Sequence, residues 1–523
     1  MKRKPYLRNI LIVLLAIALS IGSAELFLRI GTPTARETKE AEAQNNVLMK
    51  MQLERVPADR ISHLSFREDL PDVKSPHAPA DAYPLIDDMP RADAYDENTK
   101  RIVMIGDSFI WGAYSLDRNE VFWELLEDSL RAQGYNVRVD AVASPGVNAY
   151  QELRWLTDTP LADELQPDLV LFGYVVNDTI PDFLSDFSSY AINQTLSSKT
   201  IDAENLIPFA GLIHAFCPAI YNTLWTRALL NAIKTGDEEY YYVGGYTPIL
   251  RGSVLEEYVS SFAQPLNEYA ADAPFPVVVM HLPYSPDKGV SKELTKPLPE
   301  VYDACQNVDF YDCLDEFCSD FASAKHKKNY RVNASDGHPG SATNYFYAQY
   351  FEKILKEYYP EVLGEKQNTD LRCGKPTVND WLPYGVSPRL VNNTDQTAEY
   401  TLTYPSETDS DAGRYDAHGK AITPYFLTQP VGEHYIRVSF DTPVDLKNVA
   451  ISGENVENID LYYACINEKL GYDDHTVRPF GKKSDDGFLW TDDSPDRVTG
   501  LCIHADIRDD AEALLTLRVT AGT

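Results

Sequence analysis

The segment Arg101-Ile-Val-Met-Ile-Gly-Asp-Ser-Phe109 joins a short apolar, β-branched run to a Gly-Asp-Ser turn. A run of this kind, bounded by a turn, is typical of a buried strand. Residues 121–133 follow with apolar side chains at helical spacing, and residues 137–142 again have the composition of a strand. The segment therefore predicts the first strand of an alternating strand and helix pattern.

The alternation continues along the chain. Residues 150–156 favour a helix, residues 168–173 and 276–280 favour buried strands, and residues 344–359 favour a closing amphipathic helix. Strands that alternate with helices indicate a parallel sheet covered on both faces. We therefore expect an α/β domain.

The residue composition and pattern of the sequence change after Cys373. Short runs rich in β-forming residues are separated by Asp-, Gly- and Pro-rich turns, and they occur at residues 400–404, 435–440, 449–452 and 514–519. Several of these runs alternate between apolar and polar residues, which is typical of an all-β sandwich. We expect the boundary between Leu363 and Cys373.

These patterns predict four parts. Residues 98–366 would form the α/β domain, with a helical insertion at about residues 200–266, and residues 367–523 would form an accessory β-sandwich. Residues 32–97 are polar and Pro-containing, and they are interpreted as a stalk or linker. Residues 1–31 form the fourth part.

The N-terminal part is basic and then apolar. Lys2, Arg3, Lys4 and Arg8 precede an apolar run from Ile10 to Ile21. It is either a signal peptide cleaved near Gly22-Ser23-Ala24 or an uncleaved transmembrane anchor that extends to Ile30. Both alternatives predict an extracytoplasmic protein: periplasmic, on the cell surface or secreted.

Composition limits the possible partners. The chain has 523 residues with 47 Lys and Arg and 79 Asp and Glu, so its formal net charge is −32. Such a balance argues against nucleic acid as a partner, and it disfavours an anionic membrane surface as the main one. Seven cysteines agree with export, where disulfides are permitted, but their pairing is left open. The spacing of Cys313 and Cys318 does not match a tight zinc knuckle, and we expect no metal site.

Polar residues follow the predicted strands and precede the last helix. Ser108 ends the first strand, Gly146 and Asn177 lie in the loops after two later strands, and Asp336 and His338 share one loop. In an open parallel sheet, functional groups collect at the C-terminal ends of the strands. A serine nucleophile needs a base and a third group that orients the base, and His338 with Asp336 supplies both. The N–H groups of Ser108 and Gly146 and the Asn177 amide are candidate oxyanion donors.

Taken together, these residues resemble a known family. Ile105-Gly-Asp-Ser-Phe109 resembles the first block of the GDSL, or SGNH, hydrolases, and Gly146 matches the second block. Asn177-Asp178 matches the third block and Asp336-Gly-His-Pro339 the fifth, in the family's order over residues 98–362. The resemblance implies a flavodoxin-like three-layer α/β/α fold. It also implies an esterase, lipase, carbohydrate deacetylase or acyltransferase.

The resemblance assigns roles to the same residues. It implies Ser108 as nucleophile, His338 as base and Asp336 as the orienting acid, with Ser108, Gly146 and Asn177 forming the oxyanion hole. One position departs from the family: the common fifth block has Asp three residues before His, where this chain has Ser335. His281 is the alternative base, but it has no carboxylate next to it in the sequence and is interpreted as a structural residue.

The sequence therefore predicts an exported serine esterase that removes O-acyl groups, chiefly acetyl, from a carbohydrate without a metal or organic cofactor. An O-acyltransferase acting on a surface glycan and a non-catalytic glycan-binding envelope protein remain as alternatives.

Aromatic side chains could bind the substrate or fill cores. Those of the insertion are interpreted either as a pocket over the site or as the core of a helical cap: Phe209, Phe216, Tyr221, Trp225, Tyr240, Tyr241 and Tyr242. Trp111 and Tyr114 could line the same pocket. Tyr462, Tyr463 and Trp490 could stack on sugar rings but favour a sandwich core. The acidic segment Asp409-Ser-Asp-Ala-Gly413 is interpreted as a solvated turn, because the Glu that would complete a calcium loop is missing.

Overall fold

The computed structural model describes most of the predicted α/β part and the strands of the C-terminal part. The described residues are 20–25, 85–86, 98–113, 121–144, 146–179, 200–201, 206–236, 242–243, 247–283, 288–324, 327–332, 336–372, 387–394, 397–404, 432–444, 446–467, 472–479, 481–484, 489–491, 497–507 and 513–521.

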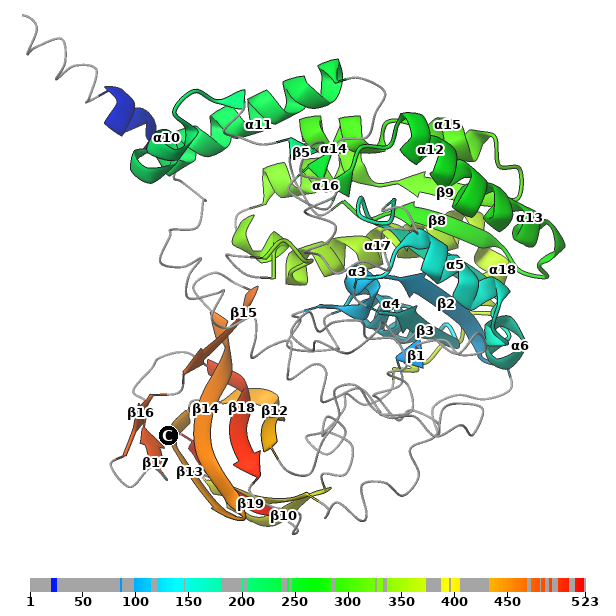
Figure 1. Cartoon of the computed structure of the whole chain (residues 1–523). Helices are drawn as coiled ribbons and strands as arrows, with labels where there is room; N and C mark the ends of the chain where they lie inside the picture. The colour runs from blue at the N-terminus through cyan, green and yellow to red at the C-terminus, as the bar shows by residue number, and fades with distance from the viewer. Residues whose placement is uncertain are drawn as a thin grey trace, which may run out of the picture.

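A mixed sheet forms the centre of the α/β part (Figure 1). Among the described residues it has six strands in the order β1-β3-β2-β4-β8-β9. The last five pair in parallel, and β1 pairs antiparallel with β3 at the edge. The strands are β1 (Leu85–Ile86), β2 (Lys100–Gly106), β3 (Val137–Ala143), β4 (Leu169–Tyr174), β8 (Val277–His281) and β9 (Val308–Asp312).

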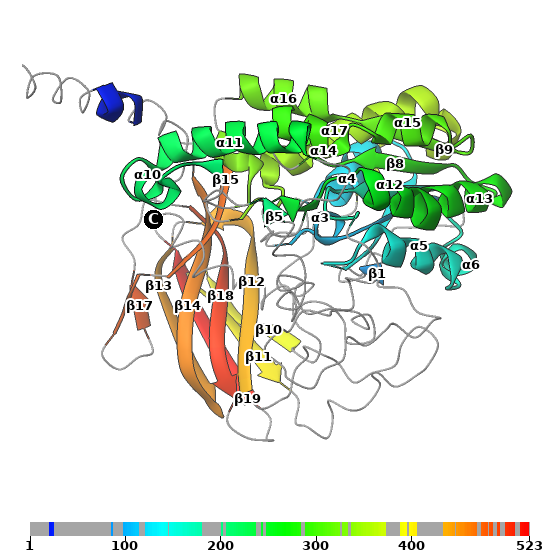
Figure 2. The same ribbon diagram turned by 45° about the horizontal axis from the view of Figure 1, so that its top comes forward.

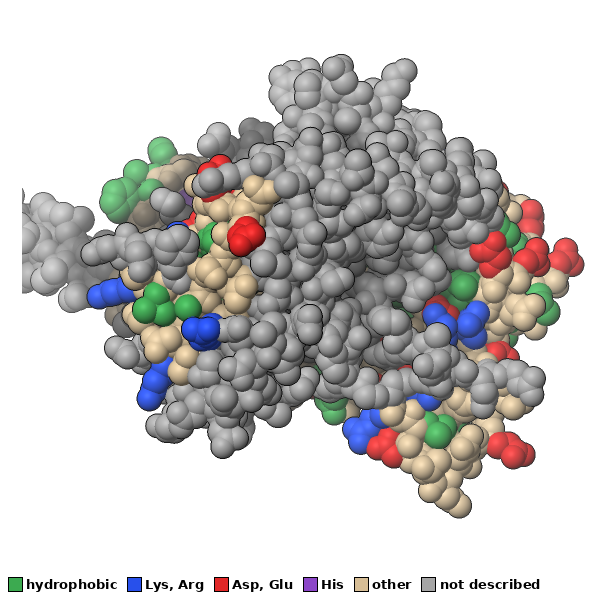
Figure 3. Space-filling view, turned by 90° about the horizontal axis from the view of Figure 1, so that it is seen from below, with side chains coloured by type: hydrophobic (Ala, Val, Ile, Leu, Met, Phe, Trp, Pro, Cys, Tyr) green, Lys and Arg blue, Asp and Glu red, His purple; other side chains and the backbone are tan. Residues whose placement is uncertain are grey.

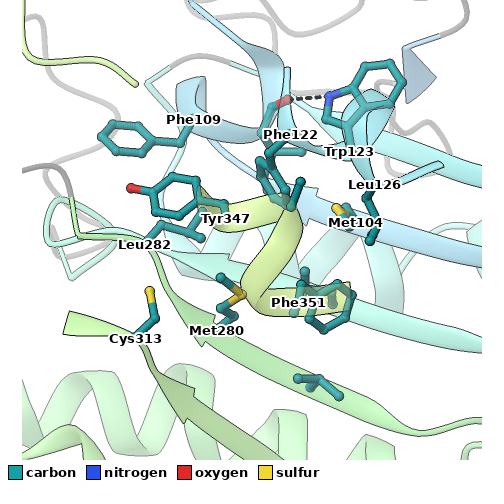
Figure 4. Close-up of a cluster of buried hydrophobic side chains, with 14 of the residues drawn as sticks. Met104, Phe109, Phe122, Trp123, Leu126, Met280, Leu282, Cys313, Tyr347 and Phe351 are labelled. Carbon is teal, nitrogen blue, oxygen red and sulfur yellow. Dashed lines mark hydrogen bonds between the residues drawn. The ribbon is translucent and has the colours of Figure 1, made fainter. Parts of the chain in front are cut away.

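Side chains of β2 alternate between two hydrophobic layers, as the period of a strand requires. Ile102 and Met104 join one buried cluster, and Val103 and Ile105 join the other. Helices that contribute to the first cluster are α3 (Ser108–Trp111), α4 (Phe122–Ala132), α14 (Lys288–Thr295), α16 (Leu314–Ser323), α17 (Ser341–Tyr358) and α18 (Pro360–Leu363). Figure 4 shows part of this layer, including the Trp123 indole N–H that donates to the carbonyl of Ile110 over 2.9 Å.

The opposite layer is also helical. Its helices are α5 (Ala149–Thr157), α6 (Leu161–Leu165), α12 (Gly252–Tyr258), the π-helix η4 (Val259–Ala263), α13 (Gln264–Asp272) and α15 (Leu298–Asp303). Tyr258, Phe262 and Leu266 from this group are buried in the second cluster. The second half of the expected insertion therefore covers the sheet instead of standing apart from it.

The predicted alternation of strands and helices is confirmed for this sheet. Two strands were not expected: β9 was not predicted, and β1 lies in the stretch interpreted as linker. The sequence Val308-Asp-Phe-Tyr-Asp312 carries two carboxylates in five residues, which hides it from a search for apolar runs. Residues 364–372 continue past α18 and bind back on α4, because Leu371 N–H donates to the carbonyl of Arg131 and the Arg131 guanidinium donates to that of Leu371.

The first half of the insertion forms a separate helical arm. It contains α10 (Ala210–Phe216) and α11 (Pro218–Thr235), together with a small sheet of β5 (Thr200–Ile201), β6 (Tyr242–Val243) and β7 (Thr247–Pro248). Leu229 and Ile233 of α11 are buried in the first hydrophobic cluster, so the arm is fixed to the α/β part at its C-terminal end.

The C-terminal residues form two antiparallel sheets (Figure 2), which confirms the predicted β character. One has the order β10-β11-β19-β13-β17-β16 and the other β12-β18-β14-β15. In β18, Leu501, Ile503 and Ala505 alternate as buried residues. Packing as a sandwich stays a prediction. The strands are β10 (Ser387–Thr394), β11 (Thr397–Tyr404), β12 (Gly432–Val444), β13 (Leu446–Glu454), β14 (Val456–Asn467), β15 (Tyr472–Pro479), β16 (Lys482–Lys483), β17 (Leu489–Thr491), β18 (Arg497–Ile507) and β19 (Ala513–Ala521).

Of the N-terminal part, residues 20–25 are described, and they are helical. Within the described ranges, no helix has the length and apolar character to cross a membrane. The rest of the expected signal or anchor segment, most of the expected stalk, and the acidic segment at residues 409–413 lie outside the described residues. Among the described cysteines, Cys217, Cys305 and Cys313 carry free thiols.

Candidate active site

The candidate nucleophile lies at the sharp turn from β2 into α3. Asp107 is the N-cap of α3, and its Oδ1 accepts the N–H of Phe109 over 2.9 Å. Gly106 allows α3 to approach the strand closely, since a Cβ at this position would lie 2.3 Å from Ile110 Cγ1. This turn places Ser108 at the C-terminal end of the central strand, as the sequence predicts.

Ser108, His338 and Asp336 form one chain of hydrogen bonds. Ser108 Oγ lies 2.8 Å from His338 Nε2, and His338 Nδ1 lies 2.5 Å from Asp336 Oδ1. The same carboxylate oxygen accepts the backbone N–H of His338 over 2.8 Å. A histidine between a serine and a carboxylate can take the serine proton while the carboxylate holds its ring orientation. The two-residue offset between Asp336 and His338 therefore allows this geometry.

The loop of His338 is fastened to the residues around η5 (Lys327–Tyr330). Val332 N–H donates to the carbonyl of His338 over 2.9 Å, and Arg331 forms a β-bridge with Pro339. Gly340 is required here, because a Cβ would lie 2.3 Å from the carbonyl oxygen of Asn329. These contacts fix the backbone that carries the imidazole.

The electrostatics of Asp336 suit its contact with His338. Burial would raise the pKa of this carboxyl, but hydrogen bonds from His338 and the attraction of its imidazolium form outweigh burial. The pKa of Asp336 is therefore lower than its ordinary value. The group is a carboxylate over the range in which a histidine exchanges its proton.

The candidate oxyanion donors follow neighbouring strands. Asn177 comes after β4 and Gly146 after β3, and both strands flank β2. Gly146 has a φ of +76° and is exposed. The Asn177 amide donates to Asp107 Oδ2 over 2.9 Å, and Ser108 Oγ lies 3.2 Å from the same oxygen. Asp107 thus holds the Asn177 amide beside the turn that carries Ser108. The sequence did not predict this positioning role.

Three buried carboxyls lie behind this turn. Burial raises the pKa of Asp107, and burial together with the charge of Asp107 raises that of Glu152. Burial raises the pKa of Asp178 as well, with added repulsion from Glu152 and Asp107. Asp178 Oδ2 accepts the N–H of Val175 and so shapes the turn that carries Asn177. The role of Asp107 could have been found from the sequence, because Asp is preferred at helix N-caps. No comparable sequence signal marks Glu152 as a buried carboxyl.

No family model matches the chain, and no curated protein does. Solved structures are similar to it at low identity. A two-domain esterase active on acetylated mannans, co-crystallised with mannopentaose, is 8% identical over 81% of this chain and 91% of its own, with a TM-score of 0.29. An acetyl xylan esterase is 13% identical over 49% and 99%, with a TM-score of 0.26. A lipase/acylhydrolase from Enterococcus faecalis is 14% identical over 49% and 96%, with a TM-score of 0.25.

A second histidine and carboxylate pair lies two strands away. His281, the alternative base, is fully buried at the end of β8, and its Nδ1 lies 2.8 Å from Asp312 Oδ1 at the end of β9. His281 has no carboxylate next to it in the sequence. The fold supplies one, Asp312, from β9, a strand that was not predicted. Ser108 pairs with His338, so the geometry favours His338 as the base.

Aromatic residues fall mainly outside the site. Phe209 and Phe216 are exposed on the arm, and Trp225 packs against the first hydrophobic cluster. Trp111 and Trp490 are buried core residues. The interpretation of Phe209 and Phe216 as the core of a helical cap is therefore wrong, whereas their interpretation as a pocket lining stays a prediction. Tyr114, Tyr240 and Tyr241 lie outside the described residues, as do the side chains of Tyr242 and Tyr463.

Phe109 was not predicted as a site residue. Its ring centroid lies 5.4 Å from that of His338, which restricts the space beside the imidazole.

Proposed function

We propose that this chain is a serine esterase of the SGNH type that hydrolyses O-acyl esters, chiefly O-acetyl groups, on a carbohydrate. The observation that carries the proposal is the hydrogen-bond chain from Ser108 Oγ through His338 to Asp336. The contact of Asn177 with Asp107 supports the proposal, because this contact holds an amide donor beside the turn that carries Ser108.

In the proposed acylation step, Ser108 Oγ attacks the ester carbonyl carbon while His338 Nε2 takes the hydroxyl proton. The carbonyl oxygen becomes an oxyanion, which the N–H groups of Ser108 and Gly146 and the Asn177 amide would stabilise. Asp336 would stabilise the imidazolium of His338 without taking its proton. The bond to the leaving oxygen then breaks, His338 donates its proton to that oxygen, and an acyl-serine remains.

In the proposed deacylation step, water takes the place of the departed alcohol. His338 removes a proton from this water, whose oxygen attacks the acyl carbon, and the same donors stabilise the second oxyanion. The carbon–oxygen bond to Ser108 breaks, and His338 returns the proton to Ser108 Oγ. The products are the free acid and a regenerated hydroxyl, so every bond and proton of the cycle is accounted for.

The surroundings of Ser108 support a short acyl group. The Phe109 ring lies beside the imidazole, and Ser108 itself is buried. A net charge of −32 disfavours polyanionic substrates by long-range repulsion. A neutral glycan with small ester substituents fits both features.

We also propose that the protein works outside the cytoplasm, held by its N-terminal segment. The basic cluster and the apolar run from Ile10 to Ile21, within a candidate membrane span that extends to Ile30, support this location. Carbonate extraction of membranes that contain the full chain tests the attachment. Recovery of the full chain, with its original N-terminus, in the carbonate-resistant pellet supports an anchor, whereas a soluble exported chain that begins near residue 25 would show that the segment is cleaved.

Acetate release tests the activity. The full chain is incubated with acetylated xylan, acetylated mannan and p-nitrophenyl acetate, with Ser108→Ala as the matched control. Release by the wild type alone supports the esterase. Acetyl transfer from p-nitrophenyl acetate to an added oligosaccharide, with little free acetate, would instead assign an acyltransferase. Glycan binding without any turnover would assign a binding protein.

A further inference from the structure

The arm formed by α10 and α11 carries an unusual set of exposed apolar side chains. Phe209 is 80% exposed, Leu212 62% and Phe216 73%, and Leu206 and Leu224 are also exposed. Isolated exposed apolar residues are ordinary, but a gathering of them marks a contact surface. We call residues 206–224 the apolar corner. Hydrophobic side chains gather at the left of Figure 3, the end at which Figure 1 draws α10.

Phe209 has an unusual backbone for its side chain. It caps α10 with φ +61° and ψ +31°, the left-handed region that is unfavourable for a residue with a Cβ. Its ring projects into solvent and gains no packing that would offset this cost. Because the exposed ring of Phe209 does not contribute to the folded core, its strained backbone points to a role for the ring at the surface.

The N-terminal segment ends at the same corner. Glu25 is only 7% exposed, and its carboxylate accepts the N–H groups of Ala219 and Ile220, over 3.1 and 3.0 Å, at the start of α11. A carboxylate at this position satisfies N–H groups that have no partner within the helix. These bonds tie the far part of the proposed membrane span, Ile10–Ile30, to the residues directly after α10.

The charge of the corner differs from that of the chain. No Asp or Glu occurs from Asn205 to Gly236, although the chain has 79 acidic residues in 523. Arg227 and Lys234 are the charged residues of this stretch. An apolar surface with no acidic residue of its own, beside a Glu25 that is buried, suits the boundary between lipid headgroups and acyl chains.

We propose that the apolar corner rests on the outer face of the lipid bilayer, with Phe209, Leu212 and Phe216 inserted at the headgroup level. The inference rests on the proposed N-terminal anchor, whose exit point Glu25 fixes beside the corner. Since Leu229 and Ile233 fasten the other end of α11 to the α/β part, the contact sets the orientation of the catalytic domain above the membrane.

Photocrosslinking of the full chain tests this contact. The chain is reconstituted in phosphatidylcholine vesicles with p-benzoylphenylalanine at position 216. Tyr345, which is 56% exposed on α17, provides the matched control for an exposed aromatic position elsewhere. A third variant, at position 15, reports the anchor itself. Lipid adducts are identified by mass spectrometry, and we expect at least about tenfold more lipid adduct at position 216 than at position 345.

The outcomes separate the two proposals. Lipid adducts at positions 216 and 15 support both. Adducts at position 15 alone keep the anchor and overturn the membrane contact of the corner. Adducts at position 216 alone keep the contact and overturn the anchor. Crosslinks from position 216 to a second copy, or to another segment of the same chain, overturn the membrane contact, as does the absence of adducts at both positions.

Discussion

The side-chain amide of Asn177 donates to Asp107, the residue that immediately precedes the candidate nucleophile, over 2.9 Å. Asp107 is fully buried and accepts the N–H of Phe109 with its other carboxylate oxygen. One carboxylate thus caps α3 and fixes the amide. An amide has two hydrogens on its nitrogen, so Asn177 can hold Asp107 with one and meet a developing oxyanion with the other.

Asp107→Asn tests this positioning role. The new side chain can keep its oxygen on the Phe109 N–H, but its NH₂ group cannot accept the Asn177 hydrogen. We expect kcat to fall by about tenfold, less than complete loss of the donor would cause, with KM little changed. Steady-state kinetics on p-nitrophenyl acetate measure both constants. An unchanged kcat in a folded variant would remove Asp107 from the account.

Asn177→Ala removes the amide donor. We expect a loss of about 2.7–4 kcal/mol of transition-state stabilisation, or about 10²–10³ in kcat. The double variant with Asp107→Asn should be little worse than Asn177→Ala alone, because Asp107 acts through the amide. Additive losses would show that the two residues work independently.

Asp336→Asn tests the orienting carboxylate. Its side-chain NH₂ group would favour the histidine tautomer with the proton on Nε2, which cannot accept the proton of Ser108. We expect kcat to fall by a factor on the order of 10⁴, in a variant that still folds cooperatively. Asp370→Asn is the control, because Asp370 is exposed and pairs with Arg372. A near-normal kcat for Asp336→Asn would show that a group other than Asp336 orients the His338 ring.

The buried carboxyls predict a pH dependence of stability. Burial raises the pKa of Glu152 and that of Asp178, so the folded protein binds more protons than the unfolded chain above the ordinary carboxyl range. The free energy of unfolding should therefore fall as pH rises towards the folded-state values. Glu152→Gln should flatten this decline, whereas the exposed control Glu164→Gln should not. Urea denaturation at several pH values measures the free energy of unfolding. An equal slope of this free energy against pH in both variants would contradict the role of Glu152.

The central strands and the triad could be predicted because each has a local signal. The run Ile102–Ile105 is apolar and ends at a turn, and Asp336 lies two residues from His338 in the sequence. Their meeting with Ser108 follows from the parallel order of the sheet, which brings the C-terminal ends of neighbouring strands together.

Other features depend on tertiary contacts that a sequence does not display. The sequence of β9 is rich in carboxylates, so the pairing of Asp312 with His281 was hidden. Glu152 was not predicted to be buried, because a charged residue on a helix normally faces solvent. Phe209 and Phe216 were interpreted either as a pocket lining or as a cap core, yet α10 leaves both side chains exposed, which excludes the core.

We propose that Ser108 is a nucleophile activated by His338. The most direct measurement is labelling of the full-length wild type with a fluorophosphonate, with the modified residue identified by mass spectrometry, beside folded Ser108→Ala and His338→Ala. We expect a phosphonyl adduct on Ser108 in the wild type, none in Ser108→Ala, and strongly slowed labelling in His338→Ala. No adduct on Ser108 in the folded wild type, or equal labelling of all three proteins, would contradict it.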